Sequence, residues 1–212
     1  TINVTGGDLA VNQSGTTPTF TNTGTINIDP MRVFTLGSSS PAVAGTLNVN
    51  STTFFGTGII NANVANAGTI NPGLSPGMIT INGNYTQAAS GVLNMEINGA
   101  TPGSGFDQLD VNGQVTLAGT LNVANTFTPA VGQTFRIIDN DLSDSVSGTF
   151  TGLPEGSTIT SGGATFRIRY AAGDGNDVVL QEGSTCETIV TNTNDSGTGS
   201  LRAAINCANS DA

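Results

Sequence analysis

The sequence predicts an all-β protein with a solenoid fold, in which short strands wind into coils that stack on one another. The first observation is a recurring pentapeptide: GTLNV occurs at 45–49 and 119–123, with variants at 24–28, 68–72 and 91–95. The second is the spacing of these segments, which runs from 21 residues between Gly24 and Gly45 to 28 between Gly91 and Gly119. Such a period is typical of solenoids, in which each repeat forms one coil.

The third observation is the alternation of apolar and polar residues within each copy. In a strand, successive side chains point to opposite faces, so Ile26 and Ile28 are predicted inside, with Thr25 and Asn27 outside. The same alternation places further pairs inside: Leu47 and Val49, Leu93 and Met95, and Leu121 and Val123. Branched aliphatic residues of this kind suit a narrow apolar core between strands.

Asparagine and glycine hold fixed places in each copy. Coils stacked about 4.8 Å apart set equivalent residues above one another, so the asparagines are predicted to form a hydrogen-bonded amide ladder. Its members would be Asn27, Asn48, Asn71, Asn94 and Asn122. The opening glycines are predicted at equivalent corners, where the backbone takes a positive φ. These are Gly24, Gly45, Gly68, Gly91 and Gly119.

The amino-acid composition limits the classes of molecule that the chain is expected to bind. The chain has five basic residues, all arginine, against 15 acidic ones, and its net charge is −10. An acidic surface repels nucleic acid and anionic lipid, so neither is expected as a partner. No apolar run approaches the length of a membrane span, and no membrane insertion is expected from this segment.

The C-terminal region differs from the coils. Cys186 and Cys207 are the only cysteines, and in an oxidising compartment they could close a disulfide loop. The alternative is that they are unrelated small buried residues. The stretch 199–210, GSLRAAINCANS, predicts a short amphipathic helix with Ser200 as its N-cap. Such a helix could cap an open coil end.

Three stretches resemble known families of bacterial surface proteins. Residues 68–123 are similar to the passenger region of autotransporters, through the PGLSPG corner, the INGNY strand and the segment FDQLDVNGQVTLAGTL. Residues 148–180 resemble the segment that closes such passengers. Residues 188–209, TIVTNTNDSGTGSLRAAINCAN, resemble the opening of β-helix domains in polymorphic outer-membrane proteins.

The resemblance implies a right-handed parallel β-helix that is exported to the bacterial cell surface or beyond. It divides the chain into coils at 1–105, a closing passenger-type segment at 106–183, and a junction or cap at 184–212. The C-terminal membrane barrel and the protease triad of a full autotransporter are not found in this sequence.

Two acidic loops are weak candidates for calcium binding. AGDGNDVVL at 172–180 follows a calcium-binding nonapeptide pattern except at Ala172, and it contains Asp174 and Asp177. The second loop, DNDLSD at 139–144, contains Asp139, Asp141 and Asp144. Calcium needs six to eight oxygen ligands, which such motifs collect from consecutive repeats. Solvated turns are therefore the favoured interpretation, and no cofactor is expected.

Enzymatic activity is not expected either. Glycosidases need two facing carboxylates, and Asp107 with Asp110 is the tightest pair, but in a strand these two would point to opposite faces. The chain has no histidine or lysine to serve as a base. An acidic glycan could be contacted by Arg136, Arg167 and Arg169. The simpler interpretation of Arg167 and Arg169 is that they are outward-facing residues of a strand. An ice-binding face of Thr and Asn is disfavoured by the irregular period.

The sequence thus predicts a structural module of a secreted bacterial surface fibre, stalk or filament. Solenoid ends are unpaired edges that invite another chain, so we expect head-to-tail self-association, with 186–212 at the junction. The alternative is an adhesin domain that binds a surface glycan or a host protein.

Overall fold

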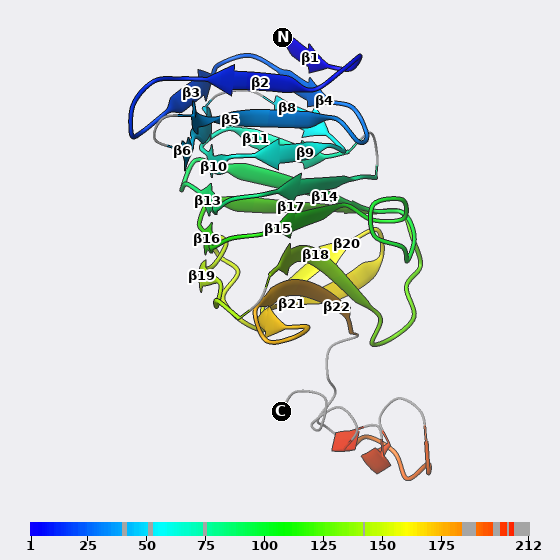
Figure 1. Cartoon of the computed structure of the whole chain (residues 1–212). Coiled ribbons are helices and arrows are strands. Elements are labelled where there is room, and N and C mark those ends of the chain that lie inside the picture. Colours follow the sequence, from blue (N-terminus) through cyan, green and yellow to red (C-terminus); the bar gives the residue numbers. More distant parts are fainter. Residues whose placement is uncertain are drawn as a thin grey trace.

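The structure is a computed structural model that describes residues 1–39, 42–50, 53–73, 76–141, 143–183, 190–196, 200–202 and 204–205. It is a β-solenoid, as predicted, with three sheets running along the stack (Figure 1). Sheet A contains, in spatial order, β1 (Ile2–Val4), β4 (Ile26–Ile28), β8 (Thr53–Gly56), β11 (Thr69–Pro72), β14 (Val92–Ile97) and β17 (Thr120–Asn125).

Sheets B and C complete each coil. Sheet B contains β2 (Leu9–Asn12), β5 (Val33–Ser39), β9 (Ile59–Asn61), β12 (Met78–Ile81), β15 (Gln108–Val111) and β18 (Thr134–Asn140), and then β22 (Asp177–Glu182), β21 (Ala164–Ala172) and β20 (Thr158–Ser161). A short strand, β6 (Ala42–Ala44), pairs with β5. Sheet C contains β3 (Thr19–Asn22), β7 (Thr46–Val49), β10 (Asn63–Asn66), β13 (Tyr85–Gln87), β16 (Val115–Leu117) and β19 (Ser147–Gly148).

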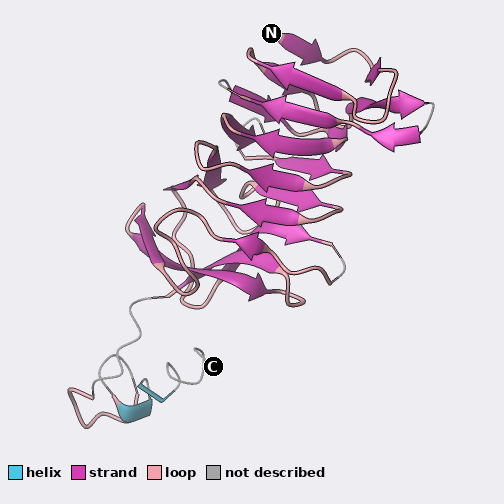
Figure 2. Cartoon of the chain, turned by 90° about the vertical axis from the view of Figure 1, so that its left-hand side faces the viewer, coloured by secondary structure: helices cyan, strands magenta, loops and turns pink. Residues whose placement is uncertain are grey.

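Strands of successive coils pair in parallel within each sheet (Figure 2). The inward residues of the recurring segments are buried as the alternation predicts: Ile26, Leu47, Val49 and Leu93 have no exposed surface. Tyr85 and Phe34 are the bulkiest of the fully buried side chains within the coils. One continuous apolar core therefore runs between the three sheets.

The segment 45–49 does not stack on the other copies of the pentapeptide, contrary to the sequence prediction. The copies at 24–28, 68–72, 91–95 and 119–123 lie in sheet A, whereas 45–49 forms β7 in sheet C. Its place in sheet A is taken by β8, which pairs with β4 and β11. All three sheets share the same inside–outside alternation, so a strand of this pattern fits any side of a coil.

The opening glycines serve close packing more than a special backbone conformation. Of the five, only Gly119 has a positive φ, of 65°. At Gly45 a Cβ atom would lie 2.5 Å from Cγ of Leu36, and at Gly91 it would lie 2.5 Å from the carbonyl oxygen of Asn66. At Gly24 a Cβ atom would make only ordinary contacts, at 3.7 Å from the nitrogen of Thr1 and 3.8 Å from Oδ1 of Asn22. The prediction that all five share one corner conformation is therefore wrong.

The coils are closed at their C-terminal end by antiparallel strands. β18 pairs with β22, β22 with β21, and β21 with β20, all antiparallel. Parallel pairing continues as far as β19, so the coils extend beyond the predicted boundary at residue 105. Phe135 of β18 joins the two parts, since its ring meets those of Phe106, Phe127 and Phe166 edge to face.

The C-terminal predictions fall mostly outside the described residues. Cys186 and Cys207 both lie there, so the disulfide stays a prediction. Of the predicted helix, Leu201, Arg202, Ala204 and Ile205 have helical conformation, and the capping role stays a prediction. In the described part of the chain, no helix has the length and apolar character needed to cross a membrane.

Candidate functional site

A groove of about 540 Å³ lies over the outer face of sheet A, where the copies of the pentapeptide stack. Its floor comes from β11, β14 and β17, and the chain before β15 adds Asp107. The lining residues are Asn71, Pro72, Gly73, Asn94, Met95, Glu96, Asp107, Asn122, Val123 and Ala124.

Three of the predicted ladder asparagines form the polar centre of this groove. Nδ2 of Asn94 donates to Oδ1 of Asn71 at 2.6 Å, and Nδ2 of Asn122 donates to Oδ1 of Asn94 at 2.9 Å. The ladder does not include Asn27 or Asn48. Asn27 is in register with Asn3 and Phe55, and Asn48 lies in sheet C, in register with Thr21 and Ala65.

Two carboxylates lie at one side of the groove, and their surroundings differ. Asp107 is 2% exposed; its Oδ1 accepts the backbone N–H of Gly77 at 2.7 Å and its Oδ2 that of Glu96 at 2.8 Å. Burial raises the pKa of Asp107 to about 7, against the opposing effect of these two hydrogen bonds, and the charge of Glu96 adds to the rise. Glu96 is half-buried.

Asp107 and Asp110 do not face one another. Asp107 lies before β15 and is bonded to backbone groups, whereas Asp110 lies within β15 and accepts a hydrogen bond from the hydroxyl of Thr80 at 3.0 Å. The acidic neighbour whose charge acts on Asp107 is Glu96, on the adjacent strand of the groove. Sequence spacing could not reveal this pair, because the two residues meet across a corner between two strands.

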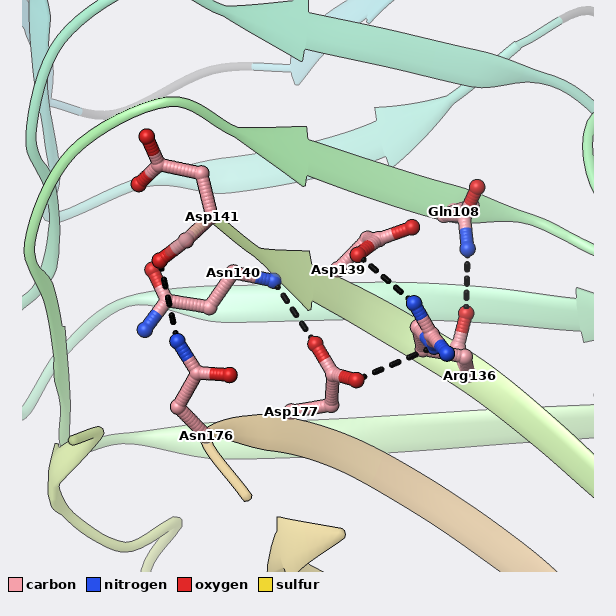
Figure 3. A network of polar contacts seen from close by, with 7 residues as sticks. All are labelled: Gln108, Arg136, Asp139, Asn140, Asp141, Asn176 and Asp177. Atoms are coloured by element: carbon pink, nitrogen blue, oxygen red, sulfur yellow. Dashed lines mark hydrogen bonds and ion pairs between the residues drawn. The ribbon is translucent and has the colours of Figure 1, made fainter. Parts of the chain in front are cut away.

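The calcium candidates lie in a different network, which joins β18 to the β21–β22 turn (Figure 3). Arg136 pairs with Asp139 at 2.9 Å and with Asp177 at 3.1 Å. Oδ1 of Asp177 also accepts the backbone N–H of Asn140 at 2.9 Å, and the Asn176 amide donates to the carbonyl oxygen of Asp141. Asp174 is exposed in the turn.

In this network a guanidinium group stands beside the aspartates that the sequence suggested as weak candidates for calcium binding. Arg136 supplies positive charge to both Asp139 and Asp177, and Asp177 is fully buried. Burial raises the pKa of Asp177, while the hydrogen bond from Asn140 and the charge of Arg136 lower it. Among the described residues, no group of three or more acidic or cysteine side chains is arranged to hold a metal ion.

A second amide ladder, which the sequence interpretation missed, lies on sheet B. Nδ2 of Asn82 donates to Oδ1 of Asn61 at 2.7 Å, and Nδ2 of Asn112 donates to Oδ1 of Asn82 at 2.7 Å. The signal was present as an Asn-Gly pair after each strand, at 82–83 and at 112–113. None of these three amides lines the groove.

Comparisons with known proteins do not assign the chain to a family. No protein-family model matches the chain, and no curated protein is significantly similar to it.

Proposed function

We propose that the chain is a structural module of a secreted bacterial surface fibre or stalk, and that modules join head to tail through the open end of the solenoid. The observation that carries the proposal is the difference between the two ends of the stack. In the described chain, β1, β2 and β3 are each the last strand of a sheet, and no strand pairs with their outer edges. On β3, the side chain of Gln13 bonds the outward N–H and C=O of Thr19.

The N-terminal coil also leaves part of the apolar core uncovered. Ile2, Leu9, Val11 and Phe20 are only partly buried, although they pack against the core. In the next coil, Ile26, Ile28 and Phe34 are buried. A further coil seated on this edge would bury the remaining apolar area and satisfy the outer backbone groups.

At the opposite end sheets A and C finish with β17 and β19, and sheet B continues past β18 with the antiparallel strands β22, β21 and β20. Ser161 of β20 hydrogen-bonds to Asn125 and to the carbonyl oxygen of Val123 on β17, so β17 is contacted on that side. The segment that follows, 184–212, includes the stretch that resembles the opening of another β-helix domain. This favours a junction in which residues 186–212 of one module add to the N-terminal edge of the next.

Two proline substitutions block the edge without removing an internal hydrogen bond. Ile2 N–H donates to Thr25 and the carbonyl of Val4 accepts from Asp29, so the N–H of Asn3, between them, points away from β4. At the end of β2, the N–H of Gln13 donates to the carbonyl oxygen of Gly37 on β5. Alternate residues of the strand face β5, so the N–H of Ala10 points outward. Proline is tolerated in an edge strand at such positions.

We expect the 212-residue chain to associate with rising concentration in sedimentation velocity and to form extended rods in electron micrographs. The double variant Asn3→Pro/Ala10→Pro and the deletion of 186–212 should both sediment as monomers, since each removes one side of the junction. Unchanged association of either variant, or a wild-type chain that stays monomeric, contradicts the proposal.

Val131→Pro provides the matched control for the proline substitutions. Val131 is 80% exposed and lies in a turn closed by the Gln133 N–H on the Ala130 carbonyl, with Gly132 at a φ of 82°. This is the geometry of a type II turn, in which proline suits the second position. The control should fold and associate like the wild type.

A further inference from the structure

We infer that the groove over β11, β14 and β17 binds a neutral saccharide chain through the amides of Asn71, Asn94 and Asn122. The inference does not depend on the assembly role proposed above. At about 540 Å³, the groove falls within the range of roughly 300–1,000 Å³ that is usual for ligand sites.

The ladder leaves hydrogen-bonding capacity for a ligand. A carboxamide has two N–H donors and an oxygen with two lone pairs. Asn94 uses one N–H on Asn71, and its oxygen accepts one bond from Asn122. Within the described chain these three amides make no other hydrogen bond. Each rung therefore retains donor or acceptor capacity at the groove floor.

The arrangement of this capacity fits hydroxyl groups. A hydroxyl both donates and accepts, so a pair of neighbouring hydroxyls matches the N–H and the oxygen of one carboxamide. Strand spacing repeats the amides every ~4.8 Å along the stack. A saccharide chain likewise presents hydroxyls repeatedly along one direction. Ala124, which is exposed, and Val123, which is half-buried, add small apolar surfaces that can contact the C–H groups of sugar rings.

Charge selects against acidic ligands. Glu96 and Asp107 lie among the lining residues, none of the described lining residues is basic, and the whole chain carries a net charge of −10. A sulfated or uronic-acid glycan would be repelled by this surface. We therefore assign the groove to neutral saccharides.

The test is an array of immobilised neutral, amino-sugar and acidic oligosaccharides probed with the full chain, followed by calorimetric titration of the strongest binder. We expect saturable binding to a neutral oligosaccharide. Asn94→Ala should weaken it by at least about tenfold, the effect of losing hydrogen bonds to the ligand. Asn122→Ala, at the exposed end of the ladder, should weaken it less.

Asn82→Ala is the matched control, because Asn82 is the middle rung of the ladder on sheet B and makes the same two amide contacts outside the groove. Its stability should fall like that of Asn94→Ala, while its affinity for the saccharide stays at the wild-type value. Equal loss of binding in both variants overturns the inference, because binding would then follow the fold and not the groove. Absence of saturable binding to every neutral oligosaccharide, or a clear preference for acidic ones, also overturns it.

Discussion

Phe135→Ala is expected to lower the free energy of unfolding by about 3–5 kcal/mol, in the range of buried phenylalanine truncations. Phe135 has no exposed surface, and its ring centroid lies 5.4 Å from that of Phe106 and 5.8 Å from that of Phe166. Phe106 precedes the coil strand β15, and Phe166 belongs to β21 of the closing segment. The truncation therefore opens a cavity where the coils meet their cover.

Urea denaturation of the variant and of Phe20→Ala measures this effect. Phe20 is only partly buried, in the open N-terminal coil, and its single described ring contact is with Phe34 at 6.2 Å. Phe20→Ala should therefore lower the free energy of unfolding clearly less than Phe135→Ala does. Equal losses in the two variants would show that the closing segment does not depend on this aromatic cluster.

Asp107 should make the protein less stable as the pH rises from about 4 to about 7. Its folded-state pKa of about 7 lies above the ordinary value of 3.8, so the folded state holds the proton more tightly than the unfolded state. The resulting stabilisation is fully present below about pH 4 and is lost as the pH rises through the folded pKa. A difference of about three pKa units corresponds to roughly 4 kcal/mol.

The measurement is the free energy of unfolding at a series of pH values for the wild type and two variants. Asp107→Asn should be less stable than the wild type at low pH, because its side-chain NH2 group would face a backbone N–H donor. Its free energy of unfolding should also change less with pH. Glu96→Gln removes a charge that raises the Asp107 pKa, so its profile should shift to lower pH. If the Asp107→Asn profile runs parallel to that of the wild type, the buried carboxyl does not titrate as described.

The parts of the fold that short-range alternation determines could be predicted from the sequence. Inside and outside positions followed from period-two patterning, as in Leu93, Asn94 and Met95, where the apolar residues are buried and the amide faces the groove. The stacking of Asn71, Asn94 and Asn122 followed from their matching places in the recurring segment.

The parts that depend on coil length and on long-range contacts could not be predicted. The strand 45–49 has the same pattern as the others yet lies in sheet C, since the alternation does not distinguish one side of a coil from another. Glu96 meets Asp107 across a corner. Arg136 meets Asp177 because their strands, β18 and β22, are neighbours in sheet B although they are far apart in the sequence. Neither contact has a signature in local sequence spacing.

The vertical register of the coils in sheet A is the claim on which the groove, the ladder and the open edge all rest. It can be measured with cysteine pairs in a Cys186→Ser/Cys207→Ser background, using dibromobimane, which becomes fluorescent when it bridges two neighbouring thiols. Asn94 and Asn122 are direct partners in the register of β14 and β17. Asn48 and Asn71 occupy the same place in successive copies of the pentapeptide but lie in different sheets.

We predict rapid bridging in Asn94→Cys/Asn122→Cys and none in Asn48→Cys/Asn71→Cys under the same conditions. Bridging of the 48–71 pair, or failure of the 94–122 pair in a folded protein, would contradict the register described here.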